Sequence, residues 1–136
     1  MTHVYIAAPF REYLEAEKLQ AMLQGAGYYV NSRWLRLARQ FSGVEPAQDF
    51  QLARAAIRTN DSDVECCDAL VAMLYPGLGR EMFAEARYAA TLHKPVFWFT
   101  GTLPSASLPP LSAYRPDNFV VETYKVLVEE LGARFR

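Results

Sequence analysis

The chain has 136 residues, a length that fits one domain and leaves no room for two. Hydrophobic residues make up 51% and charged residues 21%, which favours a buried core and argues against a disordered chain. A net charge of −1 removes the electrostatic argument for a nucleic-acid polymer or an anionic membrane as partner. Two histidines and two cysteines are too few for a structural zinc site. We therefore expect no metal and no other cofactor, and we assign any chemistry to carboxylates.

The N-terminal residues and the cysteines bear on the compartment. Residues 1–9 lack a basic segment, and their apolar run is too short for a signal peptide or a membrane span. Cys66 and Cys67 are adjacent and could form a disulfide only through a strained ring, so reduced thiols are favoured. Both features favour a cytoplasmic protein.

Strand-like and helix-like segments alternate along the chain. Short apolar runs predict strands over residues 4–8, 28–30, 68–74, 95–99 and 119–121. Helical spacing of apolar residues predicts helices over residues 11–26, 47–65, 80–93 and 122–131. We expect residues 32–46 to be irregular, and residues 101–116, which contain four prolines, to form a loop.

The order of these elements predicts the architecture. Apolar strands without alternation are typical of a parallel sheet covered on both faces. The simplest topology is a flavodoxin-like or Rossmann-like three-layer α/β sandwich, with a parallel sheet of about five strands in one domain over residues 1–136. Ligands of such sheets bind beyond the carboxyl ends of the strands. This places residues 7–11, 31–34, 74–80 and 100–102 at the functional edge.

A glycine loop, Gly77-Leu78-Gly79-Arg80, lies between a predicted strand and a predicted helix. It could cradle a phosphate or a ribose, but it is neither a dinucleotide fingerprint nor a Walker loop. Arg80 opposes the helix dipole at that end. A ligand anion would explain the arginine, and an ordinary surface position explains it as well.

Two pairs of acidic residues are candidates for chemistry. Glu81 and Glu85 are four residues apart and therefore share one face of the predicted helix. The helix dipole alone accounts for carboxylates there, and the functional alternative is an acid, a base or a nucleophile. Asp61 and Asp63 come just before the central strand, where they are either solvated or catalytic.

Residues 80–96 combine Glu85, Ala89 and a Lys94-Pro95-Val96 run at a characteristic spacing. With the opening run of residues 4–10, the segment 27–34 and the acid-led strand 68–72, they resemble the nucleoside 2-deoxyribosyltransferase family over about residues 4–100. The resemblance implies a flavodoxin-like enzyme, usually oligomeric, that cleaves an N-glycosidic bond.

The resemblance also implies roles. Glu85 matches the family's nucleophilic glutamate, and a carboxylate held beside the anomeric carbon can form a glycosyl ester. The leaving base must be protonated by a second carboxyl group, for which Asp61 or Asp63 is the candidate. The remaining expected substrate contacts are Arg11 and Arg80 to phosphate or sugar, Tyr5, Phe10 or Trp34 stacked on the base, and Pro9, Gly77, Gly79 and Glu81.

The chain departs from the family pattern at three places. Asn60 stands where the family has an acid, Arg87 follows where relatives have glycine, and residues 8–11 replace a glycine-containing element. Arg11 and Arg80 favour, slightly, the 2-deoxynucleoside 5-phosphate N-hydrolase branch. A nucleoside and its 5-monophosphate both remain candidate substrates, and both transfer and hydrolysis remain candidate outcomes.

Two other functions stay open. Asn60 in place of an acid is also consistent with a non-catalytic nucleotide-binding or sensing module. A TIR-like NAD glycohydrolase uses similar glutamate chemistry on a related sheet. In each of these cases, a sandwich of 136 residues has few residues outside the sheet and helices to cover a pocket. We therefore expect a neighbouring subunit to complete the pocket, in a homodimer or larger homo-oligomer.

Overall fold

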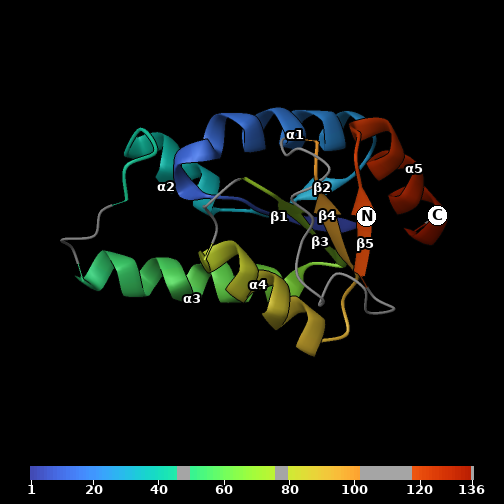
Figure 1. The fold of residues 1–136 in the computed structure, drawn as a ribbon. Coiled ribbons are helices and arrows are strands. Elements are labelled where there is room, and N and C mark those ends of the chain that lie inside the picture. The colour runs from blue at the N-terminus through green and yellow to red at the C-terminus, as the bar shows by residue number, and fades with distance from the viewer. Residues whose placement is uncertain (46–49, 76–79, 102–117, 136) are drawn as a thin grey trace.

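A five-stranded, all-parallel sheet forms the centre of the molecule (Figure 1). The computed structural model describes residues 1–45, 50–75, 80–101 and 118–135. The strand order is β2-β1-β3-β4-β5, which is the flavodoxin-like order. The strands are β1 (His3–Ala7), β2 (Tyr29–Val30), β3 (Ala69–Met73), β4 (Val96–Phe99) and β5 (Asn118–Val121). The predicted α/β sandwich is confirmed.

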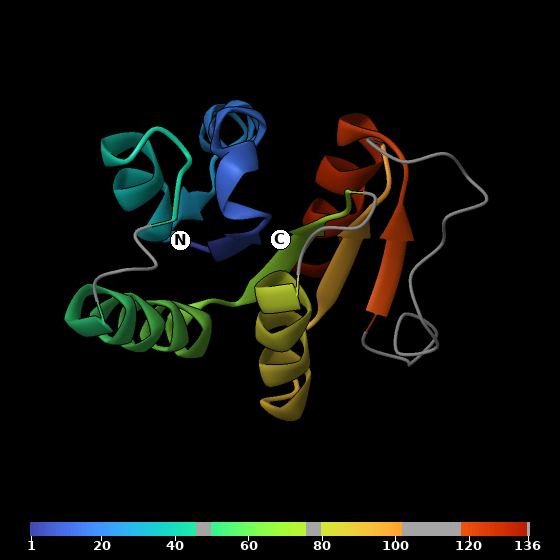
Figure 2. The same ribbon diagram turned by 60° about the vertical axis from the view of Figure 1, so that its left-hand side comes forward.

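The helices form two layers on the sheet, as Figures 1 and 2 both show. One face carries α1 (Tyr13–Gly25), α2 (Trp34–Gln40) and α5 (Tyr124–Phe135). The other carries α3 (Phe50–Cys66) and α4 (Arg80–Thr91). A short 3-10 helix, η1 (Phe10–Glu12), joins β1 to α1. Because both faces are covered, every residue of β3 and β4 is buried, which explains their continuous apolar sequences.

The predicted helices and strands agree with the structure to within a few residues, with one correction. Residues 32–46 were expected to be irregular, but Trp34–Gln40 form helix α2. Trp34, Leu35 and Ala38 lie on one side of this helix and are buried. That spacing is helical, and packing against α1 stabilises a segment too short to be stable alone. Of the predicted helix 47–65, residues 47–49 lie outside the described residues.

The edge strand β2 is short, and beyond its end side chains form the hydrogen bonds to the backbone of β1. β1 pairs with β2 only at His3↔Tyr29 and Val4↔Val30. Two residues further along each segment, the N–H of Ile6 donates to Ser32 Oγ at 2.6 Å. The carbonyl of Ile6 accepts from the indole Nε1 of Trp34 at 2.7 Å. These two bonds satisfy the buried backbone of Ile6 and fix the start of α2 beside the end of β1.

Two residues of the segments that resemble the deoxyribosyltransferase family, Lys94 and Asp68, stabilise the fold. Lys94 Nζ donates to the carbonyl oxygens of Glu65, at 2.7 Å, and of Cys67, so it closes the carboxyl end of α3. Asp68 accepts a hydrogen bond from the backbone N–H of His3 at 2.8 Å, which secures the start of β1. In the described residues, none of the helices is long and apolar enough to cross a membrane.

Candidate functional site

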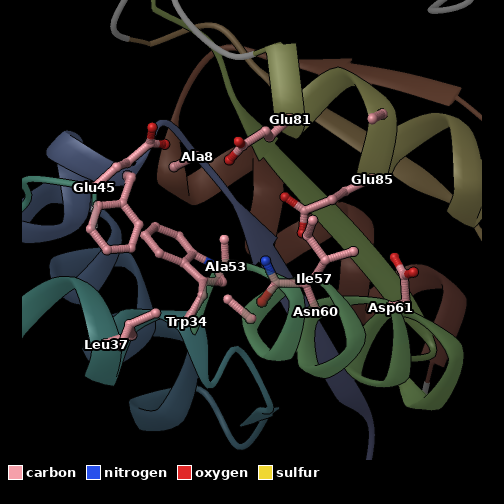
Figure 3. A pocket seen from close by; sticks show the side chains of 13 residues that line it. Ala8, Trp34, Leu37, Glu45, Ala53, Ile57, Asn60, Asp61, Glu81 and Glu85 are labelled. Carbon is pink, nitrogen blue, oxygen red and sulfur yellow. The ribbon is translucent and has the colours of Figure 1, made fainter. Parts of the chain in front are cut away.

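A cavity of about 510 Å³ opens beyond the carboxyl end of β1, between the two helical layers (Figure 3). β1 lies centrally in the sheet, and chain connections leave it and β3 in opposite directions, so this is the position where flavodoxin-like sheets bind ligands. The described residues that line the cavity are Ala8, Phe10, Trp34, Leu37, Glu45, Ala53, Ala56, Ile57, Asn60, Asp61, Glu81, Ala84 and Glu85.

One wall of the cavity is aromatic. The rings of Phe10 and Trp34 lie 6.3 Å apart between centroids and are tilted by 35°. Trp34 is only 6% exposed, and its bond to Ile6 holds the indole in place. With Leu37, these rings form a rigid apolar surface that suits a flat heterocycle.

Asp63 is not among the described lining residues, and it positions the aromatic wall through hydrogen bonds to Arg33, which precedes Trp34. Its buried carboxylate accepts hydrogen bonds from the backbone N–H of Arg33 at 3.0 Å and from Arg33 Nε at 2.9 Å. Its carbonyl accepts from Asn31 Nδ2 at 2.8 Å. Since residues 31–33 lead directly into α2, Asp63 ties helix α3 to the turn that positions Trp34.

Glu85 is the most strongly perturbed carboxyl group that lines the cavity. It projects from α4, and the buried Tyr5 hydroxyl on β1 donates a hydrogen bond to its Oε2. Burial raises the pKa of Glu85 to about 8. The charges of Glu81, Asp61 and Asp63 act in the same direction, whereas the Tyr5 hydrogen bond opposes them. Such a carboxyl group is poorly solvated and correspondingly reactive once it is ionised.

Tyr5 keeps its proton over the whole working pH range. Burial, followed by the nearby charge of Glu85, raises the pKa of Tyr5 well above its usual value. The phenol therefore acts as a fixed hydrogen-bond donor to Glu85 and leaves one Glu85 oxygen for a ligand. Tyr5 itself is not among the described residues that line the cavity.

Two further carboxyl groups line the upper part of the cavity in Figure 3. Glu81 lies one helical turn before Glu85 on α4, and its carboxyl group points into the cavity. Glu45 follows the end of α2 and lies on the opposite side. Partial burial raises the pKa of Glu81, and the charge of Glu45 adds to the effect.

Asn60 and Asp61 reach the cavity from α3. The Oδ1 atom of Asn60 is buried and has no hydrogen-bond partner within the described part of the chain. A buried acceptor of this kind is costly unless a water molecule or a ligand donates to it. Asp61 is exposed, and in Figure 3 it lies on the side of Glu85 away from Trp34.

The structure gathers part of the predicted site. Phe10, Trp34, Asp61, Glu81 and Glu85 line one cavity, and Tyr5 contacts it through Glu85. Arg11 and Arg80 are exposed, and neither belongs to the described lining. The described lining likewise lacks Pro9 and Asp63. Gly77 and Gly79 lie outside the described residues.

Several lining residues were not predicted. Ala53, Ala56 and Ile57 precede Asn60 and Asp61 on one face of α3, and the five residues have the helical spacing i, i+3, i+4, i+7 and i+8. That pattern could have indicated a shared face. No sequence pattern predicts Glu45 as a lining residue. It lies after the end of α2 at Gln40, and the tertiary path of the following residues brings it to the cavity.

Within the described ranges, no group of three or more His, Cys, Asp and Glu residues is arranged to hold a metal ion.

The fold and the site together define a flavodoxin-like α/β sandwich with a carboxylate-lined cavity at the end of its first strand. No protein-family model and no curated protein matches the sequence. Several solved structures share the fold, among them the following two. The CMP N-glycosidase BcmB from Clostridium botulinum has a TM-score of 0.61 and 14% identity, over 97% of this chain and 98% of that one. A 2-deoxyribosyltransferase from Leishmania mexicana has a TM-score of 0.62 and 16% identity, over the full length of both chains.

These neighbours are consistent with the resemblance to nucleoside 2-deoxyribosyltransferases, and they confirm the fold that it implied. By name, the first is an N-glycosidase of CMP and the second transfers a 2-deoxyribosyl group. At this level of identity the similarity shows the fold alone.

Proposed function

We propose that this protein cleaves the N-glycosidic bond of a nucleoside or 2-deoxynucleoside, with Glu85 as the nucleophile. The observation that carries the proposal is the half-buried Glu85 carboxyl group, held by the Tyr5 hydroxyl at the edge of a cavity with an aromatic wall. Two structural neighbours with N-glycosidase and deoxyribosyltransferase descriptions add support from the fold.

The proposed first step uses the ionised form of Glu85. One carboxylate oxygen attacks the anomeric carbon as the bond to the base breaks, and the bond electrons leave with the base nitrogen. A glycosyl ester on Glu85 results. Tyr5 holds the other oxygen, so it keeps the attacking oxygen directed toward the sugar and lowers the cost of ionising a buried acid.

The aromatic wall supplies the binding energy for the base. Phe10 and Trp34 offer a surface on which a purine or a pyrimidine can stack, worth about 1–3 kcal/mol per base in comparable sites. Because Trp34 is already fixed by its bond to Ile6, stacking orders little that was mobile before.

The charge of the cavity favours an uncharged substrate. The described lining has four carboxyl groups, from Glu45, Asp61, Glu81 and Glu85, and no lysine, arginine or histidine. A 5-monophosphate would bring about two negative charges into this field, and a nucleoside brings none. We therefore place the nucleoside ahead of the nucleoside 5-monophosphate that Arg11 and Arg80 suggested.

The second step decides between hydrolase and transferase. Water attacking the glycosyl ester releases the free sugar, whereas a second base regenerates a nucleoside. Both attack the same carbon from the side that the first base has left.

The test is base release measured by chromatography. The purified protein is incubated with 2-deoxynucleosides, ribonucleosides and their 5-monophosphates, with and without an added acceptor base. We expect free base from at least one nucleoside, and slower release from the matching 5-monophosphate. Acid quenching, digestion and peptide mass measurement should show one sugar attached to the peptide that contains Glu85.

Two variants sharpen the test. Glu85→Gln should reduce base release by about 10³-fold or more, because it removes the nucleophile. Glu129→Gln removes an exposed carboxylate from α5, on the opposite face of the sheet, and should leave the rate unchanged. The proposal is wrong if no compound in the panel releases base, or if Glu85→Gln releases it as fast as the unaltered protein. Nucleotide binding without turnover would instead indicate a binding or sensing module.

The expected homo-oligomer remains a prediction. Light scattering on the active protein tests it directly, and a strictly monomeric active species would contradict it.

A further inference from the structure

The proposed reaction needs a proton donor for the departing base, and the cavity offers a limited choice. Five polar side chains line it within the described residues: Glu45, Asn60, Asp61, Glu81 and Glu85. The proposed function already assigns Glu85 as the nucleophile. Asn60 stands on α3 where an acid was expected, but an amide has no proton that it can give up at neutral pH.

We propose that Glu81 is the acid that protonates the leaving base, and the base that later activates the incoming water. This inference rests on the proposed function and assigns one residue of that reaction.

The spacing on α4 is the first argument. Glu81 and Glu85 are separated by four residues on one helix, which puts their Cβ atoms about 5–6 Å apart on the same face. Glycosidases that proceed through a glycosyl ester hold their two carboxyl groups about 5–5.5 Å apart. Two glutamate side chains that start one helical turn apart on the same face can bring their carboxyl groups to that separation.

The position relative to the aromatic wall is the second argument. In Figure 3 the Glu81 carboxyl group points toward the space between Glu85 and the Trp34 side of the cavity, where a stacked base would lie. Asp61 lies on the other side of Glu85, away from Trp34. When a base stacks on the aromatic wall and its sugar lies at Glu85, the base is on the Glu81 side of the cavity. Asp61 is then on the opposite side of the sugar.

The electrostatic surroundings are the third argument. Glu45 and Glu85 are the titratable groups that face Glu81 from the other wall and from its own helix. Both are negative when ionised, so each favours the protonated form of Glu81. When the two neighbouring carboxyl groups share one proton, the productive form of the pair is the one with the proton on Glu81 and the negative charge on Glu85.

The proton balance closes without any further reagent. As the glycosidic bond breaks, its electron pair stays with the base, and the Glu81 proton moves to a nitrogen or oxygen of that base. Water then enters the vacated position and gives a proton to the Glu81 carboxylate while its oxygen bonds to the anomeric carbon. Glu85 leaves as a carboxylate, and Glu81 is again protonated.

The test compares leaving groups that differ in their need for a proton. 7-Methyl-2-deoxyguanosine carries a positive charge on the base, which departs without being protonated, whereas 2-deoxyguanosine requires a proton. For pyrimidines, 5-fluoro-2-deoxyuridine and 2-deoxyuridine give a second pair with a better and a poorer leaving group. We expect Glu81→Gln to lower kcat/KM about 100-fold or more for the poorer member of the accepted pair. The loss for the better member should be several-fold smaller.

Asp61→Asn is the comparison variant, since it neutralises another exposed carboxylate that lines the cavity. It should change both members of a pair by the same small factor, about 3-fold or less. Equal losses for both members in Glu81→Gln would overturn the inference, because a merely structural role does not distinguish leaving groups. A selective loss in Asp61→Asn would move the acid to Asp61. Absence of base release from every compound by the unaltered protein would instead overturn the proposed function itself.

Discussion

Replacing Glu85 by glutamine should stabilise the protein at alkaline pH. Burial raises the pKa of Glu85 from an ordinary 4.5 to about 8, so the folded protein holds a proton that the unfolded chain releases. Because the folded state binds more protons between these values, stability is complete below about pH 4.5 and declines as the pH rises through about 8. Glutamine keeps the shape of the protonated acid and does not titrate.

The size of the effect follows from the two pKa values. A difference between 4.5 and about 8, at 1.36 kcal/mol for each tenfold change in proton affinity, corresponds to roughly 5 kcal/mol as an upper bound. At this chain length, about 3–4 °C of melting temperature corresponds to each kcal/mol, which gives at most about 15–20 °C. The total stability of such a domain is about 5–15 kcal/mol, so the effect should be large enough to measure.

The assay is thermal unfolding of the unaltered protein and Glu85→Gln at pH 5, 7 and 9, with urea unfolding at the same pH values. We expect nearly equal stability at pH 5 and a clear advantage for Glu85→Gln at pH 9. Glu129→Gln should show no such pH-dependent difference from the unaltered protein. A constant difference between Glu85→Gln and the unaltered protein across this range would refute the argument, since it would mean that Glu85 ionises as easily in the folded as in the unfolded chain.

Three further predictions concern the residues around Glu85. Tyr5→Phe removes a hydrogen-bond donor worth about 1.5–3 kcal/mol to the ionised Glu85 carboxylate. The rate of base release should rise with pH as Glu85 ionises, and in Tyr5→Phe this rise should occur about 1–2 pH units higher. An unchanged pH–rate profile would contradict the role of Tyr5. Trp34→Leu removes both the aromatic wall and the bond to Ile6, and should cost about 2–4 kcal/mol of stability and raise KM at least about 10-fold; urea unfolding and kinetics would check both, and an unchanged KM would exclude stacking. Asp63→Asn should lower stability by about 1–3 kcal/mol through its bonds to Arg33, with kcat changed less than about 3-fold; a selective loss of kcat would return Asp63 to the catalytic role.

The helix α2 shows what chain-local patterns leave undecided. Trp34, Leu35 and Ala38 are spaced as on a helix, yet a run of seven residues is too short to be stable without packing. Its stability comes from α1 and from the indole bond to Ile6, both contacts between distant parts of the chain. The sequence therefore indicated the anchors but not the helix.

Asp61 and Asp63 illustrate the same limit within the site. Two residues apart on α3, they point in different directions around the helix, since each residue turns by about 100°. Asp61 lines the cavity, and Asp63 is buried against Arg33. Helical spacing predicts that the two side chains point apart, but only the path of residues 31–33 decides which of them is buried.

The sequence by itself determined the alternation of apolar strands and helices, and hence the parallel sheet and the edge of it where a ligand binds. It also determined that Glu81 and Glu85 share a helical face, because that follows from 3.6 residues per turn. Only the tertiary structure decided what each carboxyl group can do. The pKa of Glu85 depends on burial and on Tyr5, which is 80 residues away in the chain. Desolvation and charge act through space, so the opening expectation that carboxylates carry the chemistry became specific only when folding set them around one cavity.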